Sequence, residues 1–305
     1  KLSRTALLLA AGFTATMLAA PALAQESQAD KDLIIVTAQR ENQTGVRQGG
    51  NAGVLGNKPA EDLPFSVRSY NSALILNQQP QTLGQVLEND PTIRTTTGFG
   101  IAGELFNIRG FTLGGDDIGY DGLYGIMPRQ LAAPELYESV EVLNGSSAFL
   151  NGAAPGGSGI GGSVNLVPKR ATDGDTTRAT LGYTAPEHVG GSFDIGRRLG
   201  ADGEWGIRLN GAARSGDVSV DDEFRSTYVL GGAIDYDSGP LRLSLDLAYQ
   251  RVKVSHFRPK LSVSGLGVIP REPDASTNFG QPWQYTTLRD VFGQFRAEYD
   301  IAEDV

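Results

Sequence analysis

From about Thr176 onward, apolar and polar side chains alternate in runs that are separated by clusters of Gly, Asp, Ser and Pro. In the clearest run, one face carries Leu241, Leu243, Leu245, Leu247 and Tyr249, and the other carries Arg242, Ser244, Asp246 and Gln250. A period of two predicts antiparallel β-strands. The runs at 205–214 and 291–301 repeat the pattern, and weaker ones lie at 177–184, 190–198 and 225–236, so the sequence predicts six strands.

The connections between these predicted strands alternate in length. Short links at 199–203 and 237–239 alternate with longer ones, the longest from about Val252 to Gln284. This asymmetry is typical of outer-membrane barrels, in which the apolar face meets lipid and the polar face lines the lumen. Alternation alone also fits a half-buried soluble sheet. Six strands cannot close a membrane barrel, since the smallest bacterial ones have about 8. We therefore expect an incomplete barrel, in a sequence that is a fragment.

The N-terminus predicts export from the cytoplasm. Lys1 and Arg4 precede an apolar stretch at 6–20, and Ala22-Leu23-Ala24 has the small-x-small pattern of a signal-peptidase site. We expect residues 1–24 to be a signal peptide that is cut after Ala24. The alternative is a membrane anchor, because the stretch approaches the roughly 17 apolar residues that span a bilayer.

Residues 44–170 show a mixed pattern that predicts a compact α+β domain. A short helix is expected at 82–87, where Asn89-Asp90-Pro91 ends it. Strands are expected at 106–109, 139–143 and 163–167.

Composition excludes several classes of function. The 305 residues include 26 basic and 35 acidic ones, and the resulting net charge of −9 disfavours nucleic-acid binding. Cysteine is absent, which excludes disulfides, thiolate metal sites and a cysteine nucleophile. The two histidines, His188 and His256, are far apart in the sequence. We therefore expect neither a histidine metal site nor an enzyme.

Two further motifs have simple structural interpretations. The G-x-G-x-x-G spacing at 157–162 matches a dinucleotide fingerprint, but the residues that follow, 163–167, predict a strand where the fingerprint requires a helix. We interpret it as a flexible Gly-rich turn. The acidic pairs at 116–117 and 221–222 lie in polar loops, and we expect them to be solvated charges.

Five segments in order carry a resemblance to a known family: NQQPQTLGQVLENDPTI, FNIRGF, DGLYG, PELYESVEVLNGSSAFLNG and PGGSGIGGSVNLVPKR. They resemble the plug domain of TonB-dependent outer-membrane receptors, in the ferric-siderophore branch. The resemblance implies an α+β plug followed by transmembrane antiparallel β-barrel strands, about six of roughly 22 in a barrel that holds a plug. It divides the chain into a mature N-terminus at 25–43 with a TonB box at 32–38, a plug at 44–170 and barrel strands at 171–305.

The resemblance also implies function and partners. The protein would capture a ferric siderophore and import it across the outer membrane, with no catalysis and no cofactor beyond the iron inside its cargo. TonB, with the inner-membrane ExbB-ExbD complex, would bind the box and pull part of the plug aside. The box residues are Asp32, Leu33, Ile34, Ile35, Val36 and Thr37, an extended β-branched segment that suits strand addition to another sheet. Outer-membrane lipid is a further partner.

The candidate cargo contacts are Phe99, Tyr120, Tyr124 and Arg129, because outward plug loops can offer aromatic faces and a cation. The alternative for Tyr120 and Tyr124 is packing on the barrel wall. The resemblance implies plug–barrel ion pairs at Arg109 and Glu141, but Asn144 stands where the family usually has a basic residue.

Two alternatives to siderophore import remain open at this point. The cargo could be cobalamin, haem or a saccharide. The chain could instead be a soluble periplasmic β-rich binding module, in which another sheet would cover the apolar face of 241–249.

Overall fold

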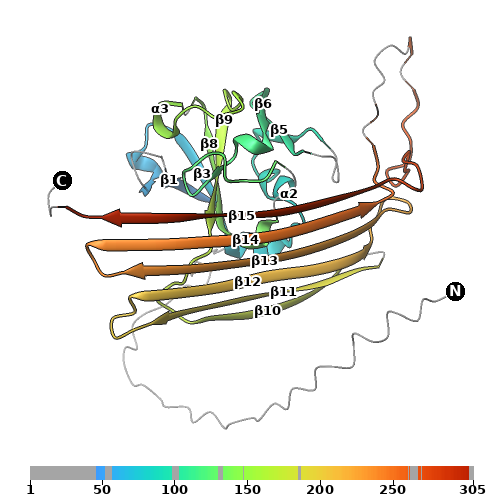
Figure 1. Ribbon diagram of the computed structural model, residues 1–305. Coiled ribbons are helices and arrows are strands. Elements are labelled where there is room, and N and C mark those ends of the chain that lie inside the picture. The colour runs from blue at the N-terminus through green and yellow to red at the C-terminus, as the bar shows by residue number, and fades with distance from the viewer. Residues whose placement is uncertain are drawn as a thin grey trace, which may run out of the picture. The chain divides into compact units, whose positions relative to one another are not determined.

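The computed structural model describes residues 46–301 except 52–56, 98–102, 130–132, 147, 185–186, 260, 262–266 and 269. The predicted signal peptide, the TonB box and Phe99 lie outside the described residues. The described part contains two six-stranded sheets and one three-stranded sheet (Figure 1). Within it, no helix is both long enough and apolar enough to cross a membrane.

The first six-stranded sheet has the order β2-β1-β3-β8-β9-β7, and the three-stranded sheet has the order β4-β5-β6. Their strands are β1 (Arg47–Asn51), β2 (Asn57–Pro59), β3 (Ser66–Asn71), β4 (Ile93–Thr95), β5 (Leu105–Ile108), β6 (Phe111–Gly114), β7 (Gly119–Tyr120), β8 (Tyr137–Asn144) and β9 (Gly162–Pro168). Strand β7 pairs with β9 in parallel, whereas the other pairs are antiparallel. We call residues 46–168 the plug layer.

Short helices complete the plug layer. They are α1 (Ser72–Gln78), α2 (Leu83–Leu87), α3 (Ala148–Asn151) and the 3-10 turns η2 (Ala60–Asp62), η3 (Gly115–Asp117) and η4 (Pro134–Leu136). The Thr82 side chain caps α2 by accepting a hydrogen bond from the Gln85 N–H at 3.2 Å. Leu83, Val86 and Leu87 are buried in the core, which confirms the predicted helix.

The six strands predicted in the second half are confirmed as one antiparallel sheet in sequence order (Figure 1). They are β10 (Thr176–Thr184), β11 (His188–Leu199), β12 (Trp205–Asp217), β13 (Phe224–Asp237), β14 (Leu241–Ser255) and β15 (Tyr285–Tyr299). The turns at 200–204 and 238–240 lie at one end, the short-turn end, and the connection at 256–284 lies at the other, the long-loop end. The plug boundary predicted at 170/171 falls between β9 and β10.

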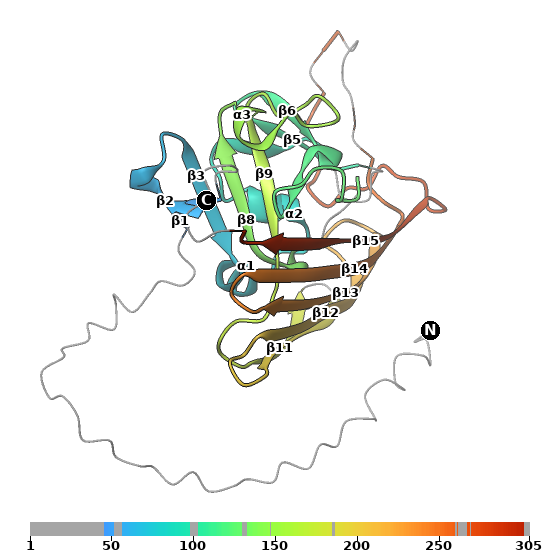
Figure 2. The same cartoon turned by 60° about the vertical axis from the view of Figure 1, so that its left-hand side comes forward.

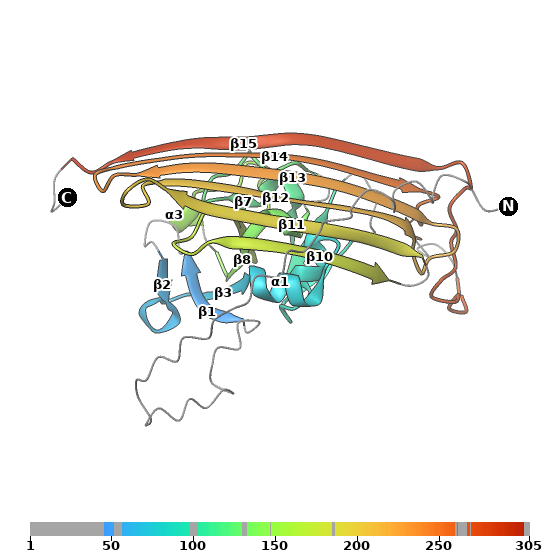
Figure 3. The ribbon, with the colours of Figure 1, turned by 90° about the horizontal axis from the view of Figure 1, so that it is seen from below.

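The two faces of this sheet differ as the alternation predicts. The plug layer lies against one face, the inner face, and no described part of the chain covers the outer face (Figure 2, Figure 3). Leu247 on the outer face is 55% exposed, whereas its neighbour Asp246 on the inner face is 2% exposed. Trp205 and Val291 are exposed on the same outer face, and Gln250 is buried on the inner one. The polar face is thus the one that the plug covers.

Candidate functional site

The contact between the plug layer and the inner face of the β10–β15 sheet includes a cluster of charged side chains centred on Asp121. Its carboxylate accepts hydrogen bonds from the Arg170 guanidinium at 2.7 Å and from the Gln294 amide at 2.9 Å, and it lies 3.3 Å from Arg296. Arg170 also donates to Asp246 at 2.6 Å. We call these five residues the Asp121 cluster. It joins the plug layer to β14 and β15.

Local structure explains why these side chains meet. Asp121 follows β7 in a left-handed conformation with φ of 48°, and its N–H donates to the Leu166 carbonyl at 2.8 Å. Arg170 lies two residues beyond β9, the parallel partner of β7. Asp246 and Gln294 are direct cross-strand partners on the inner face of the sheet. Burial alone would lower the pKa of Arg170, but the bonds to Asp246 and Asp121 outweigh it and raise that pKa above its usual value.

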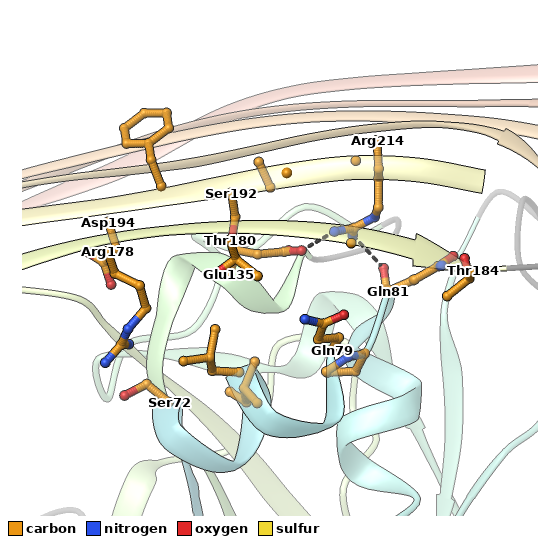
Figure 4. Close-up of a pocket in the computed structure, with 18 of the residues that line it drawn as sticks. Ser72, Gln79, Gln81, Glu135, Arg178, Thr180, Thr184, Ser192, Asp194 and Arg214 are labelled. Atoms are coloured by element: carbon orange, nitrogen blue, oxygen red, sulfur yellow. Dashed lines mark hydrogen bonds and ion pairs between the residues drawn. The ribbon is translucent and has the colours of Figure 1, made fainter. Parts of the chain in front are cut away.

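A second group of contacts ties the plug to β11 and β12. Arg214 on β12 donates to the Glu135 carboxylate of η4 and, at 3.0 Å, to the Gln81 carbonyl (Figure 4). The Gln81 side chain also lies 3.4 Å from the ring of His188 on β11. The plug layer is therefore bonded to the inner face at two places, one on β14 and β15 and the other on β11 and β12.

A cavity lies beside this second group, between α1 and strands β10–β12 (Figure 4). It encloses about 910 Å³ of empty space, part of it open to solvent. Small side chains line the side formed by the β10–β15 sheet, which we call the wall; among them are Thr180, Ser192 and Ala212. Gly190 lies on the same side of the cavity. A larger residue there would clash with the neighbouring strand, because its Cβ would lie 2.3 Å from the Arg214 Cβ.

A third group lies just after β9. The Lys169 ammonium donates to the Asp194 carboxylate at 3.0 Å, and Arg208 binds the same carboxylate from β12. Lys169 and Arg170 thus form ion pairs with aspartates on different strands of the wall. Lys169 pairs with Asp194 on β11, and Arg170 pairs with Asp246 on β14. The segment that links plug and wall is fixed at its start by two ion pairs.

Tyr120 lies in the packed interface, where it is 3% exposed. Its ring meets Tyr137 edge-on at 6.4 Å between centroids and Phe292 of β15 at 5.9 Å. Burial is the main reason that its pKa is raised above the usual value. The structure therefore buries the Tyr120 ring between the plug layer and the inner face of the β10–β15 sheet.

Tyr124 and Arg129 remain on or near the plug surface. The Arg129 side chain is 71% exposed, and its guanidinium lies 3.7 Å from Asp116. Tyr124 lines a cavity together with Asp117 and the Gly-rich turn at 157–159. Both candidates are thus adjacent to η3. Phe99, the remaining candidate, lies outside the described residues.

Asp117 corrects one expectation, because its carboxylate is not solvated but is 2% exposed. It accepts hydrogen bonds from the Gly156 N–H at 2.6 Å, from the Ser158 N–H at 2.9 Å and from the Ser158 hydroxyl. Burial would raise the pKa of Asp117, but these bonds outweigh it and hold the pKa below its usual value. A Cβ at Gly156 would lie 2.8 Å from the carboxylate oxygens. The Gly-rich turn is therefore clamped onto η3.

Arg109 and Glu141, the residues expected to pair plug with barrel, occupy different settings. Arg109 is exposed in the turn after β5 with φ of 51°. Glu141 is buried in β8 and accepts a hydrogen bond from the Asn165 amide at 2.9 Å. Asn144 accepts from the Thr92 hydroxyl at 2.8 Å, a hydroxyl that also binds the buried Asp90. The ion pairs to the wall described above come from other residues.

The described residues contain no group of three His, Asp or Glu side chains that could hold a metal ion. What the interface can do is hold two layers together through polar contacts that water can replace. Sequence reasoning missed these contacts because their members come from distant segments. The alternation did place Asp246 on the polar face of its strand, which was the available signal.

Residues 59–158 match the family model described as the TonB-dependent receptor plug domain. The ferrichrome receptor FcuA of Yersinia enterocolitica is 38% identical over 293 residues, which cover 92% of this chain and 39% of FcuA. The ferric-pyoverdine receptor PbuA of a Pseudomonas species is 28% identical over 247 residues, covering 78% of this chain and 28% of PbuA. The chain thus spans about two fifths or less of these relatives.

Solved structures agree with the sequence relatives. The ferric preacinetobactin receptor BauA from Acinetobacter baumannii superposes with a TM-score of 0.81 at 34% identity, covering 85% of this chain and 39% of BauA. The siderophore receptor PiuA from the same species gives a TM-score of 0.71 at 21% identity, covering 85% of this chain and 37% of PiuA, which shows likeness of fold. The chain therefore belongs to the TonB-dependent receptor family and carries its plug domain together with six strands of the accompanying sheet, like the siderophore receptors that it matches.

Proposed function

We propose that the complete protein is an outer-membrane receptor that binds a ferric siderophore outside the cell and admits it to the periplasm. The observation that carries this proposal is the two-faced sheet. Its polar face holds the plug through charged groups such as the Asp121 cluster, and its apolar face is uncovered in the described residues. A sheet with these two faces suits a wall between a wet lumen and lipid.

The uncovered face favours a membrane over the soluble binding module. Val291 is 79% exposed, and the outward side chains of the other strands form a continuous apolar surface with it. A soluble module would bury such a surface, since large apolar patches rarely stay open to water. TonB-dependent siderophore receptors are outer-membrane proteins, so we place this protein there. We propose that residues 1–24 direct export and are cut after Ala24.

The mechanism consists of binding, gating and release, without catalysis. Cargo would contact the plug surface around Tyr124 and Arg129, together with Phe99, and its iron would stay inside the siderophore. TonB, energised through ExbB-ExbD, would bind residues 32–37 by strand addition and pull. The plug would move once its polar contacts with the wall exchange for water. FcuA is named a ferrichrome receptor, so ferrichrome is the first cargo to test.

The test uses the complete gene in an iron-starved strain that lacks its own siderophore receptors. Growth is scored on ferrichrome, preacinetobactin and pyoverdine, each as the ferric complex, beside haem as an alternative cargo that carries iron. Cobalamin carries no iron, so it is scored separately, as growth of a cobalamin-requiring strain that lacks its own cobalamin receptor. We expect rescue by one ferric siderophore. Growth on none of them, with the protein present in the outer membrane, would refute the proposed function. A response to haem or cobalamin alone would show that this compound, and not a siderophore, is the cargo.

A variant in the box separates binding from transport. Val36→Pro removes a backbone N–H and fixes φ, so it should abolish strand addition. Val36→Thr keeps both the N–H and β-branching and is the matched control. We expect the Pro variant to bind labelled cargo normally on whole cells but to take none up, while the Thr variant does both. Uptake of cargo by the Pro variant would contradict the proposal that residues 32–37 bind TonB.

A further inference from the structure

Three cations lie together on the outer face of the sheet, the face opposite the plug. They are Arg251 and Lys253 of β14 and Arg289 of β15. Their neighbours in the alternation, Val252 and Val254, are buried on the inner side, which sets the direction of the cations. All three belong to the half of the strands nearest the long-loop end. We call them the outer cation cluster.

The register brings these charges close to one another. Arg251 and Arg289 are direct cross-strand partners. Side chains at such positions have Cβ atoms about 4.5–5.5 Å apart, and like charges there destabilise the pair. Lys253 follows on the same face, about 7 Å farther along β14. The guanidinium of Arg251 lies 6.0 Å from the ring centre of Tyr228, and its Nε is buried without a hydrogen-bond partner in the described part of the chain.

No acidic group compensates this cluster among the residues that the structure describes. Lys253 opposes Ser226 and Thr287, and Arg251 opposes Tyr228 besides Arg289. Across the described ranges none of the three cations takes part in a salt bridge, although the chain as a whole carries a net charge of −9. By contrast, Arg197, an outward cation near the short-turn end, lies 3.4 Å from Asp175. The cluster is therefore an uncompensated positive site in an acidic protein.

The cluster also lies where the apolar surface ends on the side of the long-loop end. Along β14 the outward side chains are apolar from Leu241 to Tyr249, and Arg251 is the next one. Eight residues at about 3.4 Å each span about 27 Å along the strand. A strand tilt of about 40° turns this into about 21 Å along the membrane normal, close to the 25 Å apolar band of such barrels. The cations thus lie at the depth where lipid headgroups begin.

We propose that the outer cation cluster binds the phosphorylated headgroup of a glycolipid in the outer leaflet of the membrane. A phosphate between Arg251 and Arg289 would accept hydrogen bonds from both guanidinium groups and remove their mutual repulsion. Lys253 adds a third positive charge on the headgroup side. The acyl chains would follow the apolar side chains of Leu247 and Val291. This inference rests on the membrane placement in the proposed function, but not on the identity of the cargo.

The test measures lipid binding by the complete receptor, purified in detergent, with native mass spectrometry. The probe is lipid A with both phosphates, compared with lipid A from which a phosphatase has removed them. The variant replaces all three cations: Arg251→Gln, Lys253→Gln and Arg289→Gln. The control is Arg197→Gln, an outward cation that already has an acidic partner. Resistance to unfolding by detergent at room temperature shows that each variant is folded.

We expect wild-type receptor and the control to bind phosphorylated lipid A, and the triple variant to bind it at least about tenfold more weakly, because charge-assisted hydrogen bonds are lost. Equal binding by the triple variant, or equal binding of the dephosphorylated lipid, would overturn the proposal. Displacement of the lipid by micromolar inorganic phosphate would also overturn it, because it would show a site for free anions. If the triple variant does not fold, the exposed Arg289→Gln alone must show the loss. A receptor that binds lipid A but imports no siderophore would refute only the proposed function.

Discussion

Replacing Asp121 by Asn in the complete receptor removes one charge from the contact between plug and wall. The substitution keeps the size of the side chain and one acceptor oxygen. It adds an NH2 group that faces donors, because Arg170, Arg296 and Gln294 all direct N–H groups at this carboxylate. The inner face of β14 and β15 stays otherwise intact. Arg170 retains Asp246 as a partner.

The free-energy cost follows from burial and from the number of lost contacts. The Asp121 side chain is 11% exposed, and the two arginines are about one third exposed. Breaking a fully buried pair costs about 3–5 kcal/mol, and exposed pairs contribute up to about 1 kcal/mol. The intermediate setting gives about 2–3 kcal/mol. That corresponds to an increase of about 30- to 160-fold in the population with the plug detached.

A single cysteine can report this detachment, because the chain has none of its own. Ala248 lies on the inner face and is buried in the cluster that includes Tyr120 and Phe292 of the interface. In an Ala248→Cys background, the rate of maleimide labelling at rising urea concentration measures how often the plug leaves the wall. The free energy of detachment is compared with and without Asp121→Asn.

A double-mutant cycle with Arg296→Gln decides whether the effect belongs to the cluster. We expect the two changes together to cost less than their sum by about 1 kcal/mol, since the second removes an interaction that is already lost. Costs that add to within about 0.5 kcal/mol would refute the assignment. Asp116→Asn is the matched control: its ion pair with Arg129 is largely exposed, so it should change the free energy by less than about 1 kcal/mol.

Three further outcomes follow from the same structure. The pKa of Asp117 is lowered in the fold, so its stabilising contribution is complete above its unfolded pKa of about 3.9 and is lost as pH falls from there through the lower folded pKa. In urea denaturation, Asp117→Asn should therefore lie about 2 kcal/mol below wild type at pH 7, and this difference should shrink steadily as the pH is lowered below about 3.9. Leu247→Arg should lower insertion into lipid vesicles by about 2–4 kcal/mol, whereas Ser238→Arg in an exposed turn should not. Tyr124→Ala should weaken cargo binding about tenfold, measured by fluorescence titration, while the folded yield stays constant.

The sheet was predictable because two solvents impose a strict rule on each strand. Side chains such as Leu245 and Leu247 are exposed on one face, where the proposed function places lipid, and their neighbours face the plug, so a period of two appears in a single sequence. The helix at 83–87 was predictable for a similar local reason, since Thr82 caps its start and Asn89-Asp90-Pro91 follows its end. Information of this kind lies within about ten residues.

The contacts of Asp117 show where that information ends. Its partners at Gly156 and Ser158 are about forty residues away in the sequence. Two of its three hydrogen bonds come from backbone N–H groups, which every residue except proline has and which therefore leave no pattern in the sequence. A pair of aspartates in a polar loop therefore looks solvated in the sequence. The Asp121 cluster is hidden in the same way: the alternation indicates that Asp246 faces inward, but it does not indicate which plug residue will meet it.

The polar character of this interface bears on how a plug can be both stable and removable. An apolar contact of the same extent would lose about 25 cal/mol for every Å² exposed to water, over the whole separation of the layers. Ion pairs and hydrogen bonds such as those of Asp121 and Glu135 act over a few ångströms and are replaced by water once broken. Resistance to a pulling force is therefore concentrated at the start of the movement, after which the wetted faces separate with little further cost. Apolar contacts lie beside these polar ones: Ala212, Val229, Ala248 and Phe292 of the sheet share a buried cluster with Tyr120 of the plug, and these contacts guide the plug back to its place.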